Sequence, residues 1–431
     1  MPDITYATMT AVFLTVIVLG FTHTTLFAIL SRVRQSPPRA AEDGPFFVFV
    51  IPCLNEELVI SRSLDKLLSM TTSRQFAVLV IDDGSEDETA AIVGRYGAER
   101  VWLLRRRPPE ARQGKGAALN SAYRFLLESD ALAGRDPRQV VVAVLDADGR
   151  LRPDALDVVS PYFARPEVGA VQIGVRMYNV DESLLARMQD IEFVVFTEIY
   201  QRARRHLGTV GLGGNGQFVR LAALRSLDEQ PWTDCLTEDL NLGIRLRLNG
   251  WFSEFTGETW VEQQAVTSVS RLVRQRSRWF QGHLQCGKLV PLIVRSRRLS
   301  AHAAVDLSWH LLSPLLILAM SAWSTSFLAT LAYVWVTDPT GSWEIVSTSA
   351  IVLPVFYLLS LSPAVLYALV YRSRTQGLSI LRSLVVAHFF VVYGYMWFLA
   401  GWRAVWQTGT GKRGWAKTAR TAEQVVPEAA T

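Results

Sequence analysis

The chain has 431 residues, of which 50% are hydrophobic and 19% are charged, and its formal net charge is +5. Charged residues make up ~25% of ordinary soluble domains, so this composition argues against a disordered chain and against a purely soluble enzyme. No basic stripe interleaved with aromatic residues is present, and we therefore expect no nucleic-acid partner.

Four apolar runs without charged residues are long enough to cross a membrane, since ~20 helical residues span its hydrocarbon core. They are Ile4–Ser31, Leu307–Thr337, Ile345–Tyr371 and Ser383–Trp402. The first run has no basic residue before it and no small-residue cleavage site after it. We therefore expect it to be an uncleaved span and not a signal peptide.

Arginines flank the long polar middle segment at both of its ends. They are Arg32, Arg34, Arg39, Arg295, Arg297 and Arg298. The positive-inside rule places residues 32–306 in the cytoplasm and predicts a multi-pass protein of the cell membrane, with anionic lipids as partners. Three further spans would leave the basic C-terminal tail outside, so one run must be a hairpin, re-entrant or interfacial. We expect Leu307–Thr337, which contains Pro314, to be that run.

The middle segment begins with alternating strand and helix patterns. Continuous apolar runs at Phe46–Ile51, Phe76–Ile81 and Val140–Leu145 indicate buried strands, and the segments Glu56–Met70, Glu86–Gly94 and Ala117–Leu127 indicate helices. This alternation predicts an α/β fold with a mostly parallel sheet and helices on both faces. Ligands bind at the carboxyl ends of the strands in such sheets.

Acidic residues follow each predicted strand. Asn55-Glu56-Glu57, Asp82-Asp83-Gly84-Ser85 and Asp146-Ala147-Asp148 occupy these positions. Clustered carboxylates repel one another unless a cation lies among them, and Asp-x-Asp suits Mg²⁺. Helix N-capping explains the first two segments equally well when each is considered singly. Lys115 lies in a glycine-rich turn and could meet a phosphate. The three cysteines form no paired motif, so neither zinc nor a disulfide is expected.

Two further motifs follow the acidic segments along the chain. Thr237-Glu238-Asp239 is followed about 40 residues later by Gln275-x-x-Arg278-Trp279, just before apolar runs. With the earlier acidic motifs, the segment from Phe46 to Gly282 resembles membrane-integrated glycosyltransferases of family 2. These include cellulose, chitin, hyaluronan and poly-N-acetylglucosamine synthases and some glycolipid synthases.

The resemblance implies a cytosolic GT-A domain, a UDP-sugar donor and Mg²⁺ or Mn²⁺ as cofactor. It divides the chain into an N-terminal transmembrane helix (1–35), the GT-A domain (36–268), interfacial amphipathic helices (269–306), C-terminal transmembrane helices (307–405) and a basic cytosolic tail (406–431). In that tail, Trp415–Arg420 resembles an element that closes over the nucleotide in relatives. A disordered basic tail is the alternative.

The resemblance also implies three groups of site residues. The nucleotide-sugar site comprises Glu56, Asp83, Lys115, Asp146, Asp148, Gln275, Arg278 and Trp279, with Asp148 as the metal ligand. The catalytic residues are Asp239, the general base, and Glu238. The acceptor site comprises Gly214, Asn215, Gln217 and Trp279. Each of the two later motifs also has a purely structural explanation. Thr237 could be a helix N-cap, and Arg278 could belong to a basic amphipathic helix at the membrane surface.

Three functions stay open. The leading hypothesis is an inverting β-glycosyltransferase that extends a polysaccharide and passes it through its own spans. Four spans are few for such a channel, although a homo-oligomer or partner proteins could supplement them. The alternative is a glycolipid synthase that adds one or two sugars to a lipid such as diacylglycerol. An inactive scaffold or transport component is disfavoured by the intact Asp148, Asp239 and Arg278. No motif encodes the identity of the sugar.

Overall fold

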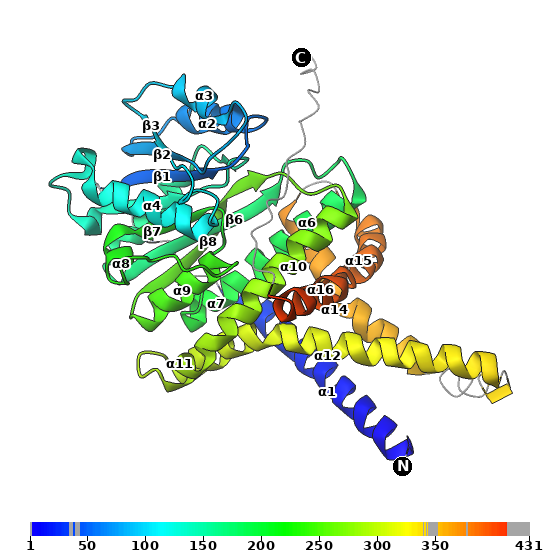
Figure 1. Cartoon of the computed structure of the whole chain (residues 1–431). Helices are drawn as coiled ribbons and strands as arrows, with labels where there is room; N and C mark the ends of the chain where they lie inside the picture. Colours follow the sequence, from blue (N-terminus) through cyan, green and yellow to red (C-terminus); the bar gives the residue numbers. More distant parts are fainter. Residues whose placement is uncertain are drawn as a thin grey trace.

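The computed structural model describes residues 2–33, 38, 44–338, 340–341, 343, 352–375 and 378–411. An α/β domain carries a group of long helices that project from one side of it (Figure 1). The expected fold class is confirmed. The predicted tail element Trp415–Arg420, and the flanking Arg34 and Arg39, lie outside the described residues.

The domain is built on one eight-stranded sheet. Its strands are β1 (Phe46–Cys53), β2 (Phe76–Asp82), β3 (Val101–Arg105), β4 (Val140–Val144), β5 (Arg150–Leu151), β6 (Val168–Met177), β7 (Gln217–Arg220) and β8 (Phe252–Gln263), in the order β3-β2-β1-β4-β7-β6-β8-β5. β1 to β4 pair in parallel, whereas β7 runs antiparallel to both β4 and β6. β6 and β8 are parallel, and β5 pairs antiparallel with β8.

Helices cover both faces of this sheet. They are α2 (Ile60–Leu68), α3 (Thr89–Gly94), α4 (Lys115–Glu128), α5 (Ala155–Val159), α6 (Leu184–Val195), a π-helix η4 (Phe196–Gln201), α7 (Arg202–Leu207), α8 (Leu221–Arg225) and α9 (Glu238–Leu248). Short 3₁₀ turns occupy Asp130–Leu132, Pro137–Gln139 and Ser160–Ala164. Alternate residues of β1 face two separate cores: Phe47 and Phe49 on one side, Val48 and Val50 on the other.

Two predicted helices start later than expected because the acidic loops hydrogen-bond to each other. α2 begins at Ile60 and α3 at Thr89. The side chain of Asn55 accepts from the backbone N–H of Glu86 at 2.8 Å, and that of Asp87 accepts from the N–H of Glu57 at 3.1 Å. Neither helix has a side-chain N-cap, so these residues connect two strand ends and do not start helices.

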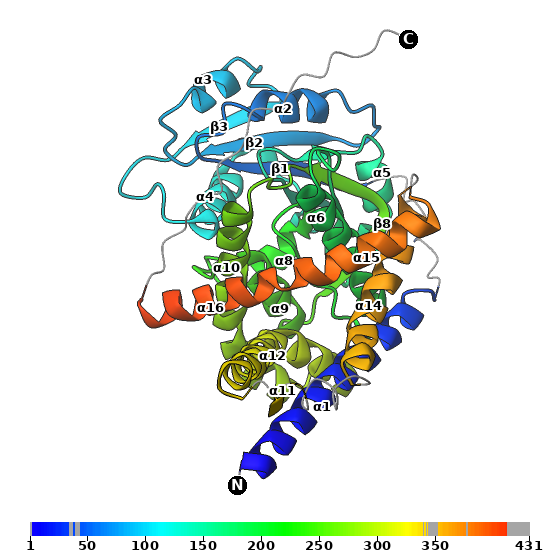
Figure 2. The same ribbon diagram turned by 90° about the vertical axis from the view of Figure 1, so that its right-hand side faces the viewer.

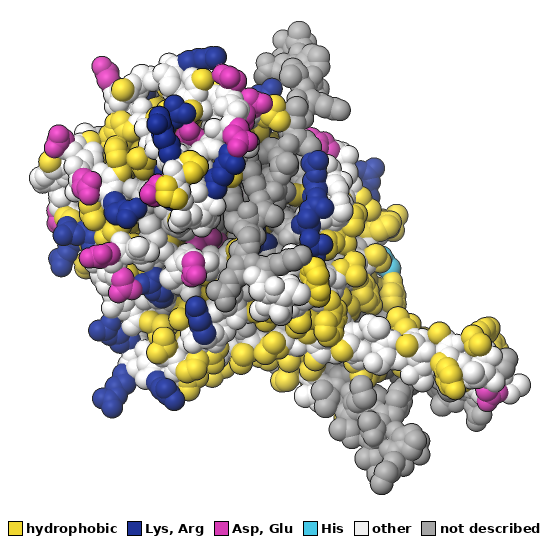
Figure 3. All heavy atoms as spheres, viewed as in Figure 1, with side chains coloured by type: hydrophobic (Ala, Val, Ile, Leu, Met, Phe, Trp, Pro, Cys, Tyr) yellow, Lys and Arg dark blue, Asp and Glu magenta, His cyan; other side chains and the backbone are white. Residues whose placement is uncertain are grey.

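The projecting part comprises α1 (Pro2–Leu30), α10 (Val269–Cys286), α11 (Val290–Arg295), α12 (Ala301–Thr337), α14 (Val352–Arg374), α15 (Ile380–Gly394) and α16 (Met396–Gly409), with a 3₁₀ turn at Gly287–Leu289 after α10. Within the described residues, two helical stretches are long and apolar enough to cross a membrane, Ala301–Thr337 and Ile380–Gly409. The runs in α1 and α14 are helical, and their crossing stays a prediction. Hydrophobic side chains cover much of this part, and charged ones cover the α/β domain (Figure 3).

The prediction that Leu307–Thr337 is a hairpin or re-entrant segment is wrong, whereas an interfacial position for this run is not tested. α12 is one continuous helix of 37 residues that contains Pro314. A proline removes the hydrogen bond to the carbonyl four residues earlier, here that of His310. The hydroxyl of Ser313 donates to this carbonyl at 2.9 Å, so the helix continues. Its start is fixed to α7, because the carboxylate of Asp306 accepts from Arg204 at 3.2 Å and from Thr209 at 2.6 Å.

Candidate active site

A cavity of about 600 Å³ lies between the carboxyl ends of the central strands and helices α10, α12 and α16. Its lining has two chemically different parts. The carboxylate limb contains Glu56, Asp83, Lys115, Asp146, Glu238 and Asp239, and the apolar limb contains Phe280, His283, His310, Ser313, Pro314, Ile317, Gly394, Trp397 and Phe398. The first part comes from the α/β domain and the second from the projecting helices.

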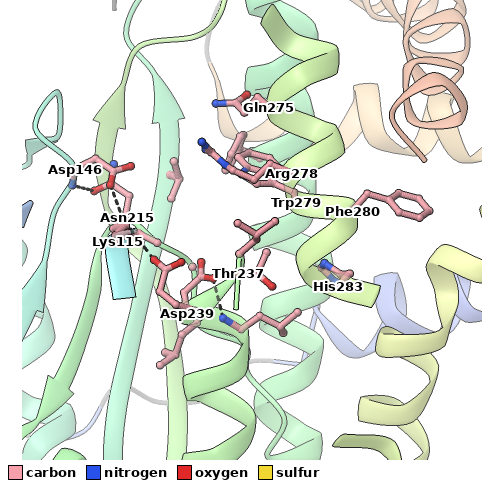
Figure 4. A pocket seen from close by; sticks show the side chains of 18 of the residues that line it. Lys115, Asp146, Asn215, Thr237, Asp239, Gln275, Arg278, Trp279, Phe280 and His283 are labelled. Atoms are coloured by element: carbon pink, nitrogen blue, oxygen red, sulfur yellow. Dashed lines mark hydrogen bonds and ion pairs between the residues drawn. The ribbon is translucent and has the colours of Figure 1, made fainter. Parts of the chain in front are cut away.

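Lys115 is the centre of the carboxylate limb. Its ammonium donates to Asp146 at 2.6 Å and to the carbonyl of Gly214 at 2.7 Å, and it lies 4.0 Å from the carboxylate of Glu238 (Figure 4). Burial alone would lower the pKa of Lys115, but the carboxylates of Asp146 and Glu238 outweigh burial and raise it. Lys115 is therefore a permanent cation that joins two acidic motifs.

Glu238 and Asp239 open α9 as an adjacent acidic pair. Burial, together with the charge of Asp239, raises the pKa of Glu238 to about 8. Burial also raises the pKa of Asp239, opposed by the backbone N–H of Leu240, which donates to its carboxylate at 2.8 Å. Both pKa values are therefore raised, and the two carboxyl groups titrate as a pair that binds a proton more readily than isolated carboxylates do.

Near the ends of β1 and β2, the carboxylate limb contains a buried ion pair. One of its two partners belongs to none of the sequence motifs. Asp83 is bound by the guanidinium of Arg106, a residue just after β3. Burial raises the pKa of Asp83, although the N–H of Arg112 and the charge of Arg106 act against it. The sequence does contain three consecutive arginines at 105–107. They point to this ion pair only if the strand β3 that precedes them is predicted as well.

The two aspartates of Asp-x-Asp lie in different places. Asp146 lines the cavity, whereas Asp148 is buried and outside the cavity lining. The carboxylate of Asp148 accepts from the backbone N–H of Gln264 at 2.8 Å. Within the described residues, no group of three His, Cys, Asp or Glu side chains is arranged as a metal site. Asp148 as metal ligand therefore stays a prediction, and Asp146 is the acidic member that faces the cavity.

The glycine-rich loop connects the two acidic motifs. Gly214 and Asn215 line the cavity, and the side chain of Asn215 accepts from the N–H of Asp146 at 3.1 Å and donates to Gln263 at 2.9 Å. Gln217, expected to bind the acceptor, is fully buried in β7 and does not line the cavity. The loop therefore positions Asp146 and Lys115.

Helix α10 brings Gln275, Arg278 and Trp279 to the cavity, as expected (Figure 4). It lies so close to the Thr237 loop that a Cβ at Gly282 would approach the backbone nitrogen of Thr237 to 2.6 Å. The basic-helix alternative accounts for Arg274, which is exposed, but not for Arg278.

Arg276 was not among the expected site residues, because the pattern leaves its position unspecified. It is buried, pairs with Glu192 at 2.5 Å and lies 3.9 Å from the ring centroid of Trp279. The hydroxyl of Tyr393 and the indole N–H of Trp397 also donate to Glu192, at 2.6 and 3.1 Å. This cluster ties α10 to α6, α15 and α16 and holds one face of the Trp279 ring.

Comparisons with known proteins agree with this geometry. The profile of a family described as "Glycosyltransferase like family 2" matches residues 44–282. Among curated proteins, "Beta-monoglucosyldiacylglycerol synthase" of Trichormus variabilis is 33% identical over 264 residues, which cover 60% of this chain and 53% of that protein. The synthase of the same name from Synechocystis is 33% identical over 261 residues, covering 58% and 52%. The chain thus spans about half the length of the curated relatives it matches.

A solved structure shows the same fold. It is the mannosyltransferase PcManGT from Pyrobaculum calidifontis in complex with GDP-Man and Mn²⁺, with a TM-score of 0.54 and 18% sequence identity. The alignment covers 90% of this chain and 97% of that one.

Proposed function

The chain belongs to glycosyltransferase family 2, and on this basis we propose that it is a membrane glycolipid synthase. It transfers a hexosyl group from a UDP-sugar to the hydroxyl of a lipid acceptor such as diacylglycerol, with inversion at the anomeric carbon. The names of the similar curated proteins favour this function over polysaccharide synthesis, which the sequence motifs alone put first.

The observation that carries the proposal is the two-part lining of one cavity. The carboxylate limb suits a nucleotide diphosphate sugar and a proton transfer. The apolar limb is open to a hydrocarbon chain, because its walls are side chains of α12 and α16 such as Pro314, Ile317 and Phe398. An acyl chain is stabilised by such an apolar wall, and aromatic rings in the same wall, such as that of Trp397, are compatible with either acceptor.

Asp239, Lys115 and Asp146 of the carboxylate limb, together with Arg278 of α10, have distinct tasks in the proposed reaction. The acceptor hydroxyl attacks the anomeric carbon, and Asp239 takes its proton as the C–O bond forms. The bond from the anomeric carbon to the diphosphate breaks, and Arg278 stabilises the charge that develops on the phosphate oxygens. Lys115 and the Gly214 loop hold Asp146 on the cavity wall beside the nucleotide.

The lining also fits a divalent cation. Its carboxylates are Glu56, Asp83, Asp146, Glu192, Glu238 and Asp239, and its Lys and Arg residues, among those the structure describes, are Lys115 and Arg278. Arg106 and Arg276 pair with Asp83 and Glu192, but the lining still holds more carboxylates than cations. A diphosphate would meet this negative charge, and carboxylate oxygens suit Mg²⁺ or Mn²⁺. Asp146 would hold the ion, which when bound neutralises charge on the departing diphosphate. Activity should vanish in EDTA and return with either metal.

The membrane arrangement follows from the directions of the helices. α1, α12 and α14 project from one side of the domain, whereas α15 and α16 run across α12 (Figures 1 and 2). One face of α16 packs on α10 through Gly401, and the opposite face exposes Leu399, Trp402 and Trp406. We propose that α1, α12 and α14 cross the membrane and that α15–α16 lies in its interface. This places the basic tail in the cytoplasm, where C-terminal protease accessibility in sealed vesicles can test it.

Product analysis tests the function directly. Purified protein in lipid nanodiscs is incubated with labelled UDP-glucose, UDP-galactose or UDP-N-acetylglucosamine, with and without dioleoylglycerol. The proposal expects a chloroform-soluble product that carries one or two sugars and forms only when the lipid is added. A water-soluble polymer that forms without added lipid would restore the polysaccharide hypothesis. Asp239→Asn serves as the inactive control.

A further inference from the structure

Two histidines lie side by side in the apolar limb. His283 comes from α10 and His310 from α12, and both line the cavity. Their ring centroids are 4.9 Å apart in an edge-to-face arrangement. Polar side chains are costly in apolar surroundings unless they form hydrogen bonds, so a pair of imidazoles in this wall calls for a function.

The position of His283 relates it to the reaction. It lies one helical turn after Trp279 and directly after Gly282, the residue that packs against the Thr237 loop. Burial lowers the pKa of His283 to about 4, against the effect of a hydrogen bond to the backbone of Trp279. The ring is therefore neutral in the cell. One nitrogen donates to the Trp279 carbonyl, which leaves the other as an acceptor. Figure 4 shows the ring beyond Thr237 as seen from Asp239.

His310 is held in place from both directions along α12. One turn before it, Asp306 is bound by Arg204 and Thr209. One turn after it, Pro314 interrupts the backbone hydrogen bonds and Ser313 takes over the His310 carbonyl. The two rings thus come from anchored positions on different helices, and both line the cavity that contains the carboxylate limb.

We propose that the His283–His310 pair binds the uncharged polar part of the lipid acceptor and holds its hydroxyl toward Asp239. This inference rests on the proposed function and adds the class of acceptor, a neutral glycerolipid whose hydroxyl and ester groups hydrogen-bond to imidazoles. Neutral rings offer donors and acceptors but no positive charge. The same cavity is lined by the acidic pair Glu238 and Asp239, and a phosphorylated lipid would bring further negative charge toward this pair.

The test measures steady-state kinetics of His283→Leu, His283→Gln and His310→Leu in nanodiscs with dioleoylglycerol. Each leucine variant should raise KM for the lipid roughly tenfold, since one or two hydrogen bonds are lost, and should leave KM for the UDP-sugar unchanged. The glutamine variant should recover part of the loss. His302→Leu is the matched control, because His302 is exposed on the same helix as His310. Dioleoyl phosphatidic acid and polyprenyl phosphate should be poor acceptors for the wild-type protein.

Each contrary outcome has its own meaning. Unchanged lipid KM in both leucine variants, or a preference for a phosphorylated lipid, would overturn this inference while leaving lipid glycosylation intact. A wild-type protein that forms only polymer would overturn the proposed function as well. Thermal unfolding of every variant separates misfolding from a binding defect, and if His283→Leu does not fold, His310→Leu and His283→Gln decide the matter.

Discussion

In the carboxylate limb, charged groups crowd around one lysine and shift one another's pKa values. In the apolar limb the main polar groups are two imidazole rings in edge-to-face contact, and one of them, His283, is hydrogen-bonded to the backbone of Trp279. The α/β domain builds the first from strand ends and loops, where charge can be placed close to a nucleotide. The projecting helices build the second from continuous helical walls, where charge would be costly beside a lipid. The comparison teaches that the charged and the apolar parts of one cavity come from different parts of the fold, and that α10 contributes residues to the lining beside both. In the proposed function, proton transfer belongs to the first part and lipid binding to the second.

The largest expected effect is confined to the carboxylate limb. Asp239→Asn keeps the size of the side chain but cannot take the proton of the acceptor, so turnover should fall roughly 10²-fold or more. Binding of UDP, measured by calorimetry, should stay close to that of the wild-type protein. Turnover near the wild-type rate would show that another group is the base.

The contact between α10 and the Thr237 loop, which joins the two limbs, can be disturbed by adding a single methyl group. In Gly282→Ala, the new Cβ would lie 2.6 Å from the backbone nitrogen and the hydroxyl of Thr237, so α10 must move away from the acidic loop. A small misplacement of reacting groups is costly, and we expect turnover to fall roughly tenfold. Gly287→Ala is the matched control, because a Cβ there meets nothing within 4 Å. Equal activity of the two variants would argue against a tight junction.

The apolar limb can be narrowed without touching the carboxylates. A side chain at Gly394 would meet no atom within 4 Å of its Cβ, and Gly394 lines the cavity. Gly394→Leu should therefore compete with the lipid and raise its KM about fivefold, on the order of one lost apolar contact. Gly409→Leu, also without neighbours at its Cβ but outside the cavity lining, is the control. A raised KM for the UDP-sugar instead would mean that the two limbs are not separate.

The last prediction concerns stability and not turnover, and its observable is a change in pH dependence. Because the pKa of Glu238 in the folded protein, about 8, lies above its ordinary value, its contribution to stability is complete at low pH and declines as pH rises toward 8. Glu238→Gln mimics the protonated side chain and removes this decline. The variant should gain thermal stability relative to the wild-type protein between about pH 5 and pH 8.5, with no gain at lower pH. A constant difference in Tm across this range would contradict the shifted pKa.

The sequence predicts the parallel half of the sheet well and the rest poorly. Phe46–Ile51, Phe76–Ile81 and Val140–Leu145 are buried on both faces, so their continuous apolar runs coincide with β1, β2 and β4 to within two residues. β8 has a mixed polar sequence, because several of its side chains are only partly buried. Periodicity alone does not distinguish such a segment from a loop.

The same division applies to the site. Asp146, Asp239 and Trp279 belong to motifs with defined spacing, and all three line the cavity. Arg106, Arg276 and the two histidines could not be predicted in the same way. Their roles depend on which elements lie next to one another, as when α10 and α12 bring together residues 283 and 310. Gln217 is the opposite case: its position near the glycine-rich loop predicts an acceptor contact, but its side chain is buried in β7 and does not line the cavity.

The ion pair between Arg204 and Asp306 has a practical consequence for producing the protein. Both side chains are almost completely buried, and Asp306 lies in the first turns of the apolar helix α12. A chain cut before residue 301 to obtain a soluble catalytic fragment would remove the carboxylate partner of Arg204 and expose the surface of the α/β domain that α12 covers. Adding Arg204→Met to such a fragment should recover part of its yield. The better strategy is to keep α12 and to solubilise the whole protein in detergent or nanodiscs.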